Sequence, residues 1–216
     1  MKKIIHNTLA LSALVLAVTH ASAATNLVKN GSMNGMTGNS YTNYTAPTNW
    51  SFITPGGERW KSYGATPSPE GGDYFGVMSL KAYAPRFSVG GLTQSISGLV
   101  VGQTYDLSFY SMSNHTNSGA WDHWDVSLGD SAAKSGVNTQ PGLGWKLNNM
   151  QFTASATTQQ LKFLAVFGAG ANPEILNLDG VSLTAAAAVP EPSSYALMLG
   201  GLIGIGALIS RRKQQG

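Results

Sequence analysis

The chain has 216 residues, no cysteine, a formal net charge of +3 and only 11% charged residues. The lack of cysteine excludes disulfides and cysteine-ligated metal sites. The positive charge belongs to the two ends, because eight basic residues face nine acidic ones between positions 25 and 184. A near-neutral domain without a basic stripe excludes nucleic acid as the expected partner.

Residues 1–24 have the layout of a secretory signal peptide. Two lysines precede the apolar run from Leu9 to Val18, and the small-residue pattern Ala-Ser-Ala follows at 21–23. This run is too short to cross a bilayer as a permanent anchor. We therefore expect cleavage after Ala23 or Ala24 and export of the remainder.

Residues 25–184 make one domain of ordinary size, in which alternating apolar residues predict β-strands. A last strand is expected over 176–184, with a kink at Asp179-Gly180, because glycine in a strand often marks a bulge. Turn-forming glycines separate the segments, and we see no long amphipathic helix between the two ends. The sequence therefore predicts an all-β jelly roll or β-sandwich. The expected same-face sets are Tyr105, Leu107 and Phe109; Trp124, Val126 and Leu128; and Leu161, Phe163, Ala165 and Phe167.

Three segments follow one another along the domain: "NLVKNGSMNG" at 26–35, "GGLTQSISGLVVGQTYDLSFYSMSN" at 90–114 and "ILNLDGVSLT" at 175–184. This order resembles that of the galactose-binding-like jelly rolls found in carbohydrate-binding modules. The resemblance spans 26–184 and implies a β-sandwich ectodomain. Its motifs are mostly structural, so they specify the fold better than a ligand.

The same resemblance implies a structural Ca²⁺ between the first and last strands. Asp179 occupies the closing aspartate position of the family, whereas Asn34 stands where the family usually has glutamate. An asparagine oxygen can still ligate a hard cation, although a lost carboxylate weakens the site. The alternative is that both side chains cap turns by hydrogen-bonding to the backbone.

The cluster "NHTNSGAWDHWDVS" at 114–127 suggests a zinc or acid–base site. In a strand Asp122 and His123 should point to opposite faces, so His123 and Asp125 form only a pair. No three-ligand set is present. We expect solvated side chains on a loop and an edge strand, and a ligand-binding loop with Trp121 and His123 remains the alternative.

Aromatic residues give the clearest indication of a binding function. The apolar C–H face of a sugar ring stacks on flat aromatic rings, and the expected ligand contacts are Trp60, Tyr63, Trp121, His123 and Trp145. Plugging the ends of a sandwich is the alternative role for such residues. Trp50 and Trp124 are expected in the core.

Catalysis is not expected. The acidic residues Glu58, Glu70, Asp73 and Glu174 are scattered in loops, and their spacing does not establish the carboxylate pair of a glycosidase. The chain has no nucleophile elbow, no Walker loop and no nucleophilic cysteine.

The last 28 residues read "VPEPSSYALMLGGLIGIGALISRRKQQG". A linker at 185–192 contains Pro190, Glu191 and Pro192. The uncharged stretch 193–210 would reach about 27 Å as a helix, enough to cross a bilayer. Arg211 and Arg212 open a basic tail, 211–216, that stays on the cytoplasmic side. We therefore expect one transmembrane helix over 193–210 and the folded domain beyond the membrane.

Pro-Glu-Pro, an apolar stretch and Arg-Arg-Lys together resemble the PEP-CTERM sorting signal of Gram-negative bacteria. The resemblance covers 189–213 and implies recognition by an exosortase near Glu191 in a host that makes exopolysaccharide. Such a tail also carries the label of ice-binding protein C-terminal domain, which describes the tail alone. The resemblance implies anchoring in the inner membrane before processing, and then a place at the cell surface or in the matrix.

The expected function is that of an exported, non-enzymatic surface or matrix protein that binds polysaccharide through loop aromatics. The expected partners are an exosortase, the secretion machinery, the membrane and an exopolysaccharide. A structural biofilm or floc matrix protein without sugar binding is one alternative. A glycan-acting hydrolase is another.

Overall fold

The computed structural model describes residues 24–37, 45–53, 58–61, 67–79, 90–113, 122–136, 144–167, 174–187, 198–206 and 209. Apart from a helical stretch at 198–206, the regular structure in these ranges is β-sheet. The strands are β1 (Ser51–Phe52), β2 (Glu58–Lys61), β3 (Phe75–Ser79), β4 (Gly91–Ser97), β5 (Thr104–Ser113), β6 (His123–Leu128), β7 (Lys134–Ser135), β8 (Lys146–Thr153), β9 (Thr158–Val166) and β10 (Glu174–Ala185).

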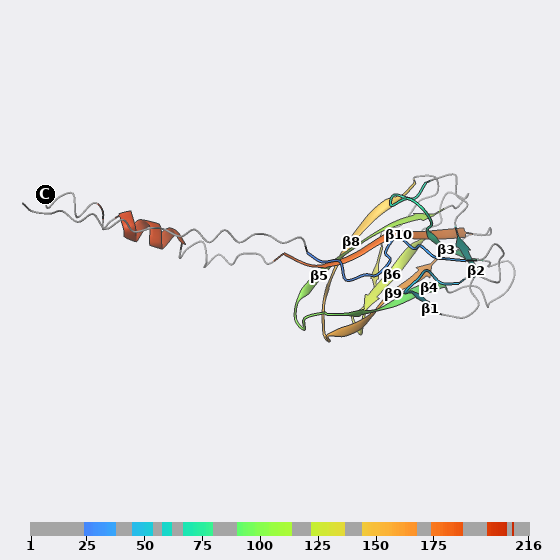
Figure 1. Cartoon of the computed structure of the whole chain (residues 1–216), viewed down its shortest axis with the longest axis horizontal. Helices are drawn as coiled ribbons and strands as arrows, with labels where there is room; N and C mark the ends of the chain where they lie inside the picture. Colours follow the sequence, from blue (N-terminus) through green and yellow to red (C-terminus); the bar gives the residue numbers. More distant parts are fainter. Residues whose placement is uncertain are drawn as a thin grey trace, which may run out of the picture.

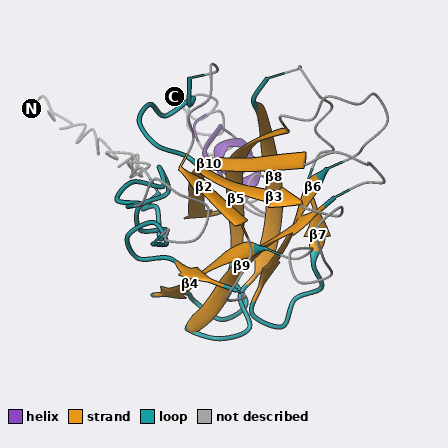
Figure 2. Ribbon diagram, turned by 90° about the vertical axis from the view of Figure 1, so that its right-hand side faces the viewer, coloured by secondary structure: helices purple, strands orange, loops and turns teal. Residues whose placement is uncertain are grey.

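The strands form two antiparallel five-stranded sheets packed face to face (Figures 1 and 2). The first sheet has the order β1-β4-β9-β6-β7, and the second has the order β2-β3-β10-β5-β8. Consecutive strands therefore often lie in different sheets, as β4, β5 and β6 do. The prediction of an all-β sandwich is confirmed.

The predicted faces of the strands are confirmed. The inward-facing residues expected in β5, β6 and β9 are buried or partly buried in the core. The predicted kink is a bulge in β10, where the register against β5 shifts between Asp179 and Ser182. Gly180 sits in this bulge with a φ of 59°, a conformation that glycine adopts without steric cost.

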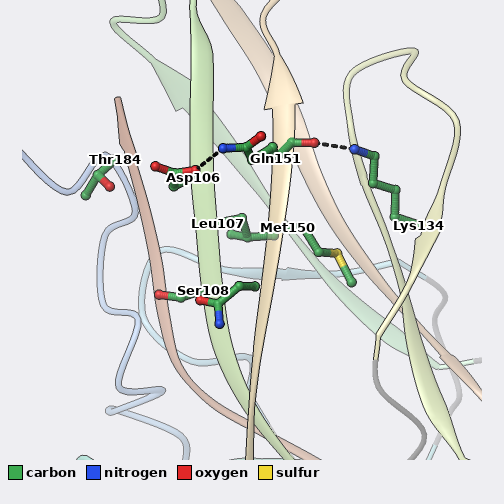
Figure 3. Close-up of a pocket in the computed structure, with 8 residues that line it drawn as sticks. Asp106, Leu107, Ser108, Lys134, Met150, Gln151 and Thr184 are labelled. Atoms are coloured by element: carbon green, nitrogen blue, oxygen red, sulfur yellow. Dashed lines mark hydrogen bonds between the residues drawn. The ribbon is translucent and has the colours of Figure 1, made fainter. Parts of the chain in front are cut away.

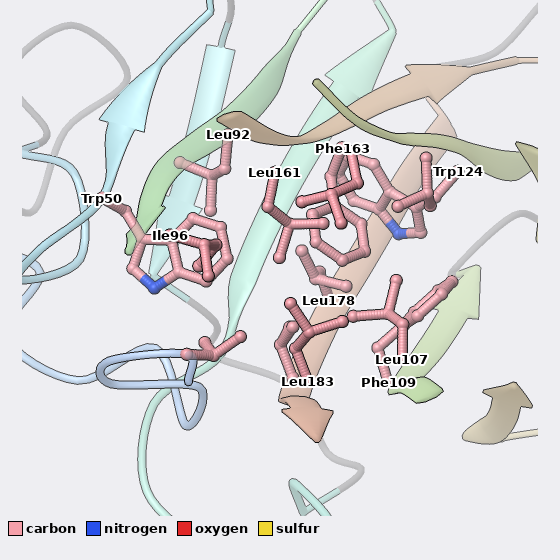
Figure 4. Close-up of a cluster of buried hydrophobic side chains, with 14 of the residues drawn as sticks. Trp50, Leu92, Ile96, Leu107, Phe109, Trp124, Leu161, Phe163, Leu178 and Leu183 are labelled. Atoms are coloured by element: carbon pink, nitrogen blue, oxygen red, sulfur yellow. The ribbon is translucent and has the colours of Figure 1, made fainter. Parts of the chain in front are cut away.

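Phe163 of β9 lies at the centre of the core between the sheets (Figure 4). Its ring makes edge-on contacts with Phe109 of the opposite sheet at 5.1 Å, with Trp50 at 6.1 Å and with Trp124 at 6.3 Å between ring centroids. Trp50 and Trp124 are 5% and 0% exposed, so their predicted core positions are confirmed.

The segment after residue 24 runs along the end of β10. The amide of Leu27 donates to the carbonyl of Leu183, and the amide of Val181 donates to the carbonyl of Gly31 at 3.0 Å. A Cβ atom at position 31 would overlap the carbonyl oxygen of Val181, so only glycine allows this approach. The first segment of the domain is thereby held against the bulge of β10.

Residues 198–206, near the C-terminus, are helical and exposed. No helix within the described ranges is both long and apolar enough to cross a membrane. Residues 193–197, 207–208 and 210 of the predicted span, like the predicted signal peptide up to residue 23, lie outside these ranges. Both predictions stay open.

Candidate functional site

The turn at 68–72 packs over the bulge of β10 and encloses the carboxyl group of Asp179. This side chain is 0% exposed. The hydroxyl of Ser68 donates to its Oδ2, whereas its Oδ1 is buried and has no hydrogen-bond partner among the described residues. Glu70 lies beside it, because a Cβ atom on Gly180 would be 3.0 Å from the Glu70 Cγ. A buried carboxylate oxygen without a partner is costly, which makes this position unusual.

Asn34 approaches the same turn from the first segment of the domain. Its amide nitrogen donates to the hydroxyl of Ser32 at 2.9 Å, and its backbone is bonded to Asn30. Its Oδ1 faces the turn, since a Cβ atom on Gly72 would lie 3.2 Å away from it. The structure therefore brings Asn34 and Asp179 to one turn, although they are far apart in the sequence.

The surroundings of the Asp179 carboxyl group shift its pKa upward. Burial raises its pKa above the usual value of 3.8, and the Glu70 carboxylate raises it further. The hydrogen bond from Ser68 and the nearby backbone amides of Gly180 and Glu70 act in the opposite direction but do not offset burial. A cation beside Asp179 would favour the charged form and lower this pKa.

The available donors are carboxylate, amide and hydroxyl oxygens. This set suits a hard cation such as Ca²⁺ better than a softer transition metal. No group of three histidine, aspartate or glutamate side chains suited to a metal occurs in the parts that the structure describes. The unpartnered Oδ1 of Asp179 is the observation that fits an oxygen-ligated cation here.

The predicted pair His123 and Asp125 lies in β6, with 3.4 Å between His123 Nε2 and Asp125 Oδ1. Both side chains are partly exposed on the outer face of the first sheet. Asp122 points the other way and is fully buried, where the hydroxyl of Ser113 donates to it at 2.6 Å. The opposite faces predicted for Asp122 and His123 are confirmed.

The predicted aromatic contacts do not form a single cluster among the described residues. Trp145 immediately precedes β8 and meets Tyr74 edge-on at 4.9 Å between centroids. Trp60 lies in β2, at the opposite edge of the same sheet, where its backbone pairs with Gly76. His123 belongs to the other sheet, and Tyr63 and Trp121 fall outside the described ranges. Their role as ligand contacts stays a prediction.

A hollow of about 680 Å³ lies on the second sheet (Figure 3). Its volume falls within the roughly 300–1,000 Å³ of typical ligand sites. The amide of Gln151 donates to the Asp106 carboxylate at 2.8 Å within it. Sequence reasoning missed this site, although Asp106 and Ser108 are on the expected polar face of β5. The lining residues are Asp106, Leu107, Ser108, Lys134, Asn149, Met150, Gln151 and Thr184.

Comparison with known proteins identifies the tail. Residues 188–213 match the PEP-CTERM protein-sorting motif, which confirms the resemblance found in the sequence. Among curated proteins, none is significantly similar to the chain.

Several solved structures have a similar strand arrangement at low identity. The CBM22-1 xylan-binding domain of Paenibacillus barcinonensis Xyn10C is 13% identical, with 78% of this chain and 99% of that chain covered and a TM-score of 0.46. TmCBM61 in complex with β-1,4-galactotriose is 16% identical, with coverages of 76% and 100% and a TM-score of 0.44. The N-terminal cellulose-binding domain of Cellulomonas fimi β-1,4-glucanase C is 19% identical, with coverages of 67% and 93% and a TM-score of 0.41. At these identities the likeness says nothing about ligands.

Proposed function

We propose that this chain is an exported surface or matrix protein whose β-sandwich binds polysaccharide without acting on it chemically. The observation that carries the proposal is the PEP-CTERM motif at 188–213, which follows the end of β10 at Ala185 almost directly. A sorting signal joined to one folded β-domain is the layout expected of a protein delivered beyond the inner membrane. An exosortase acting near Pro190, Glu191 and Pro192 is the implied processing partner.

The proposed layout follows from the sequence. A signal peptide at 1–24 directs export, and the sandwich at 25–184 binds the polysaccharide. The linker at 185–192 carries the sorting motif, while a span at 193–210 and a tail at 211–216 hold the chain in the inner membrane until processing. Delivery to the cell surface or the extracellular matrix is the last step of this proposal.

Polysaccharide is the proposed ligand because hydroxyl and amide groups line hollows on the outer faces of both sheets, and the Asp106 carboxylate joins them in the larger hollow. Glycoside hydrolysis is not proposed, since it needs a pair of carboxyl groups flanking the bond. The larger hollow has a single carboxylate, Asp106, among its described lining residues.

A structural Ca²⁺ is part of the proposal. Asp179 supplies a buried carboxylate with an unpartnered oxygen, and Asn34 turns its amide oxygen to the same turn. Glu70 adds a second carboxylate close to Gly180, which compensates for asparagine at position 34. Such an ion would tie the first segment of the domain to the last strand.

Affinity electrophoresis tests the binding proposal. The full chain, purified in mild detergent, should be retarded in gels that contain exopolysaccharide extracted from the producing bacterium, relative to gels without polysaccharide. If Trp145 contacts the ligand, Trp145→Ala should reduce retardation, with Thr157→Ala, in an exposed turn outside both hollows, as its control. Unchanged migration of the wild-type chain would leave a structural matrix protein without sugar binding as the better account.

A further inference from the structure

Six polar residues form two rows across three adjacent strands of the second sheet. In one row, Thr184 of β10 lies opposite Asp106 of β5, and Asp106 lies opposite Gln151 of β8. The next row pairs Ser182 with Ser108 and Ser108 with Asn149. Neighbouring strands lie about 4.8 Å apart, so each row presents a polar group at every strand.

From this array we infer that the outer face of β10, β5 and β8 is a binding groove for a neutral polysaccharide chain. The inference rests on the proposed polysaccharide-binding function and adds the site and the ligand class. The groove residues are Asp106, Ser108, Asn149, Gln151 and Thr184, which line the hollow of Figure 3.

The polar groups of the groove are available to a ligand. The side chains of Ser108, Asn149 and Thr184 make no hydrogen bond to any other described residue, and the Asp106–Gln151 bond leaves further acceptor positions on both groups. Asn149 and Gln151 are exposed on an edge strand. Free donors and acceptors at fixed spacing suit the hydroxyl groups of a sugar chain.

In the hollow on the first sheet, the polar groups are less available to a ligand. It measures about 300 Å³, and its polar groups are largely bonded to one another. The Thr93 hydroxyl lies 3.0 Å from Gln160 Oε1, and the buried Gln94 side chain is bonded to both backbone groups of Lys29. Ligand binding there would compete with these internal hydrogen bonds, which makes the groove on the second sheet the better site.

The charge of the groove favours a neutral ligand. Asp106 contributes one carboxylate to the lining. Lys134 is the ammonium group among the described lining residues; it donates to the carbonyl of Gln151 and lies 4.9 Å from the centroid of the Phe152 ring. The described lining thus carries one negative and one positive charge, so a polyanion gains no net electrostatic attraction there, whereas a neutral chain meets hydrogen-bonding groups.

Apolar surface adjoins the array in the next row. Tyr110 pairs with Leu147 there, directly beyond Ser108 along β5. The Tyr110 ring lies over the bulge, because a Cβ atom on Gly180 would be 2.7 Å from its Cδ2, and Leu147 is 49% exposed. The C–H face of a sugar ring can pack on the apolar surface of Tyr110 and Leu147 while its hydroxyls reach the polar rows.

Affinity electrophoresis of the full chain in xylan, β-1,4-galactan, hydroxyethylcellulose and anionic alginate tests the groove. We expect retardation by at least one neutral polysaccharide and none by alginate. Asn149→Ala should weaken binding of that polysaccharide several-fold, and Asn149→Ala with Gln151→Ala should weaken it roughly tenfold, since each variant removes hydrogen bonds to the ligand. The matched control is Thr93→Ala with Gln160→Ala, on the other sheet.

The Asn149 side chain makes no hydrogen bond within the described part of the chain and is exposed, so the Asn149→Ala variant should keep the wild-type urea midpoint. Equal loss in the groove variants and the control pair, or no loss in either, would overturn the groove but leave polysaccharide binding intact. Retardation by alginate alone would overturn the neutral ligand class. No retardation of the wild-type chain, with exopolysaccharide gels included, would overturn the proposed function and the groove together.

Discussion

Replacing Phe163 with alanine is expected to lower the free energy of unfolding by about 3–5 kcal/mol. The Phe163 side chain is fully buried and contacts aromatic rings from both sheets, so truncation leaves a cavity at the point where the sheets meet. Urea denaturation of the full chain in mild detergent, followed by tryptophan fluorescence, measures the change. Trp50 and Trp124 lie beside Phe163 and report on the transition directly.

Lys162→Ala is the matched control for this variant. Lys162 is the neighbouring residue in β9 but lies on the exposed outer face. Its truncation should change the free energy of unfolding by less than about 0.5 kcal/mol. Similar losses for Lys162→Ala and Phe163→Ala would contradict the packing described for the core.

Calcium is expected to raise the melting temperature of the full chain. At a concentration of 100 times the dissociation constant, an ion bound only by the folded state adds about 2.7 kcal/mol. For a protein of this size the corresponding shift is about 5–10 °C. Melting curves recorded with Ca²⁺ and with chelator measure it, and coincident curves would contradict the site at Asn34 and Asp179.

Asp179→Asn should abolish the calcium effect, whereas Asp130→Asn, in an exposed turn, should keep it. The pH dependence provides a second readout. The pKa of Asp179 in the folded protein is raised above the usual 3.8. Without calcium, Asp179 therefore contributes fully to stability below that pH, and this contribution is lost as the pH rises through the pKa of the folded state. The Asp179→Asn variant should not lose stability in this way as the pH rises. If its stability falls with pH as steeply as that of the wild type, another group causes the pH dependence.

Much of the sandwich could be predicted from the sequence because its central strands have one buried and one solvated face. The alternation in β5, β6 and β9 identifies the inward residues, and the glycine after Asp179 identifies the bulge. β8 was not predicted. Its inward positions include Asn148, which is buried and hydrogen-bonded to Ser111, so its residues do not alternate cleanly between apolar and polar.

The candidate sites were less predictable than the fold. Family resemblance led to Asn34 and Asp179, but nothing in the sequence places Ser68 and Glu70 over the bulge. The groove depends on the register of three strands that are far apart in the chain. Asp106, Gln151 and Thr184 become neighbours only when β5 lies between β8 and β10, and single-sequence patterns do not determine that order.

The central claim, that the sandwich works beyond the inner membrane, is tested most directly by locating the full-length protein in cells of the producing bacterium. Fractionation should recover the wild-type chain from the envelope and the extracellular matrix. Alanine at Pro190, Glu191 and Pro192 should hold the chain in the inner membrane, with the sandwich accessible to protease added to spheroplasts. Recovery of the intact wild-type chain from the cytosol would contradict the account.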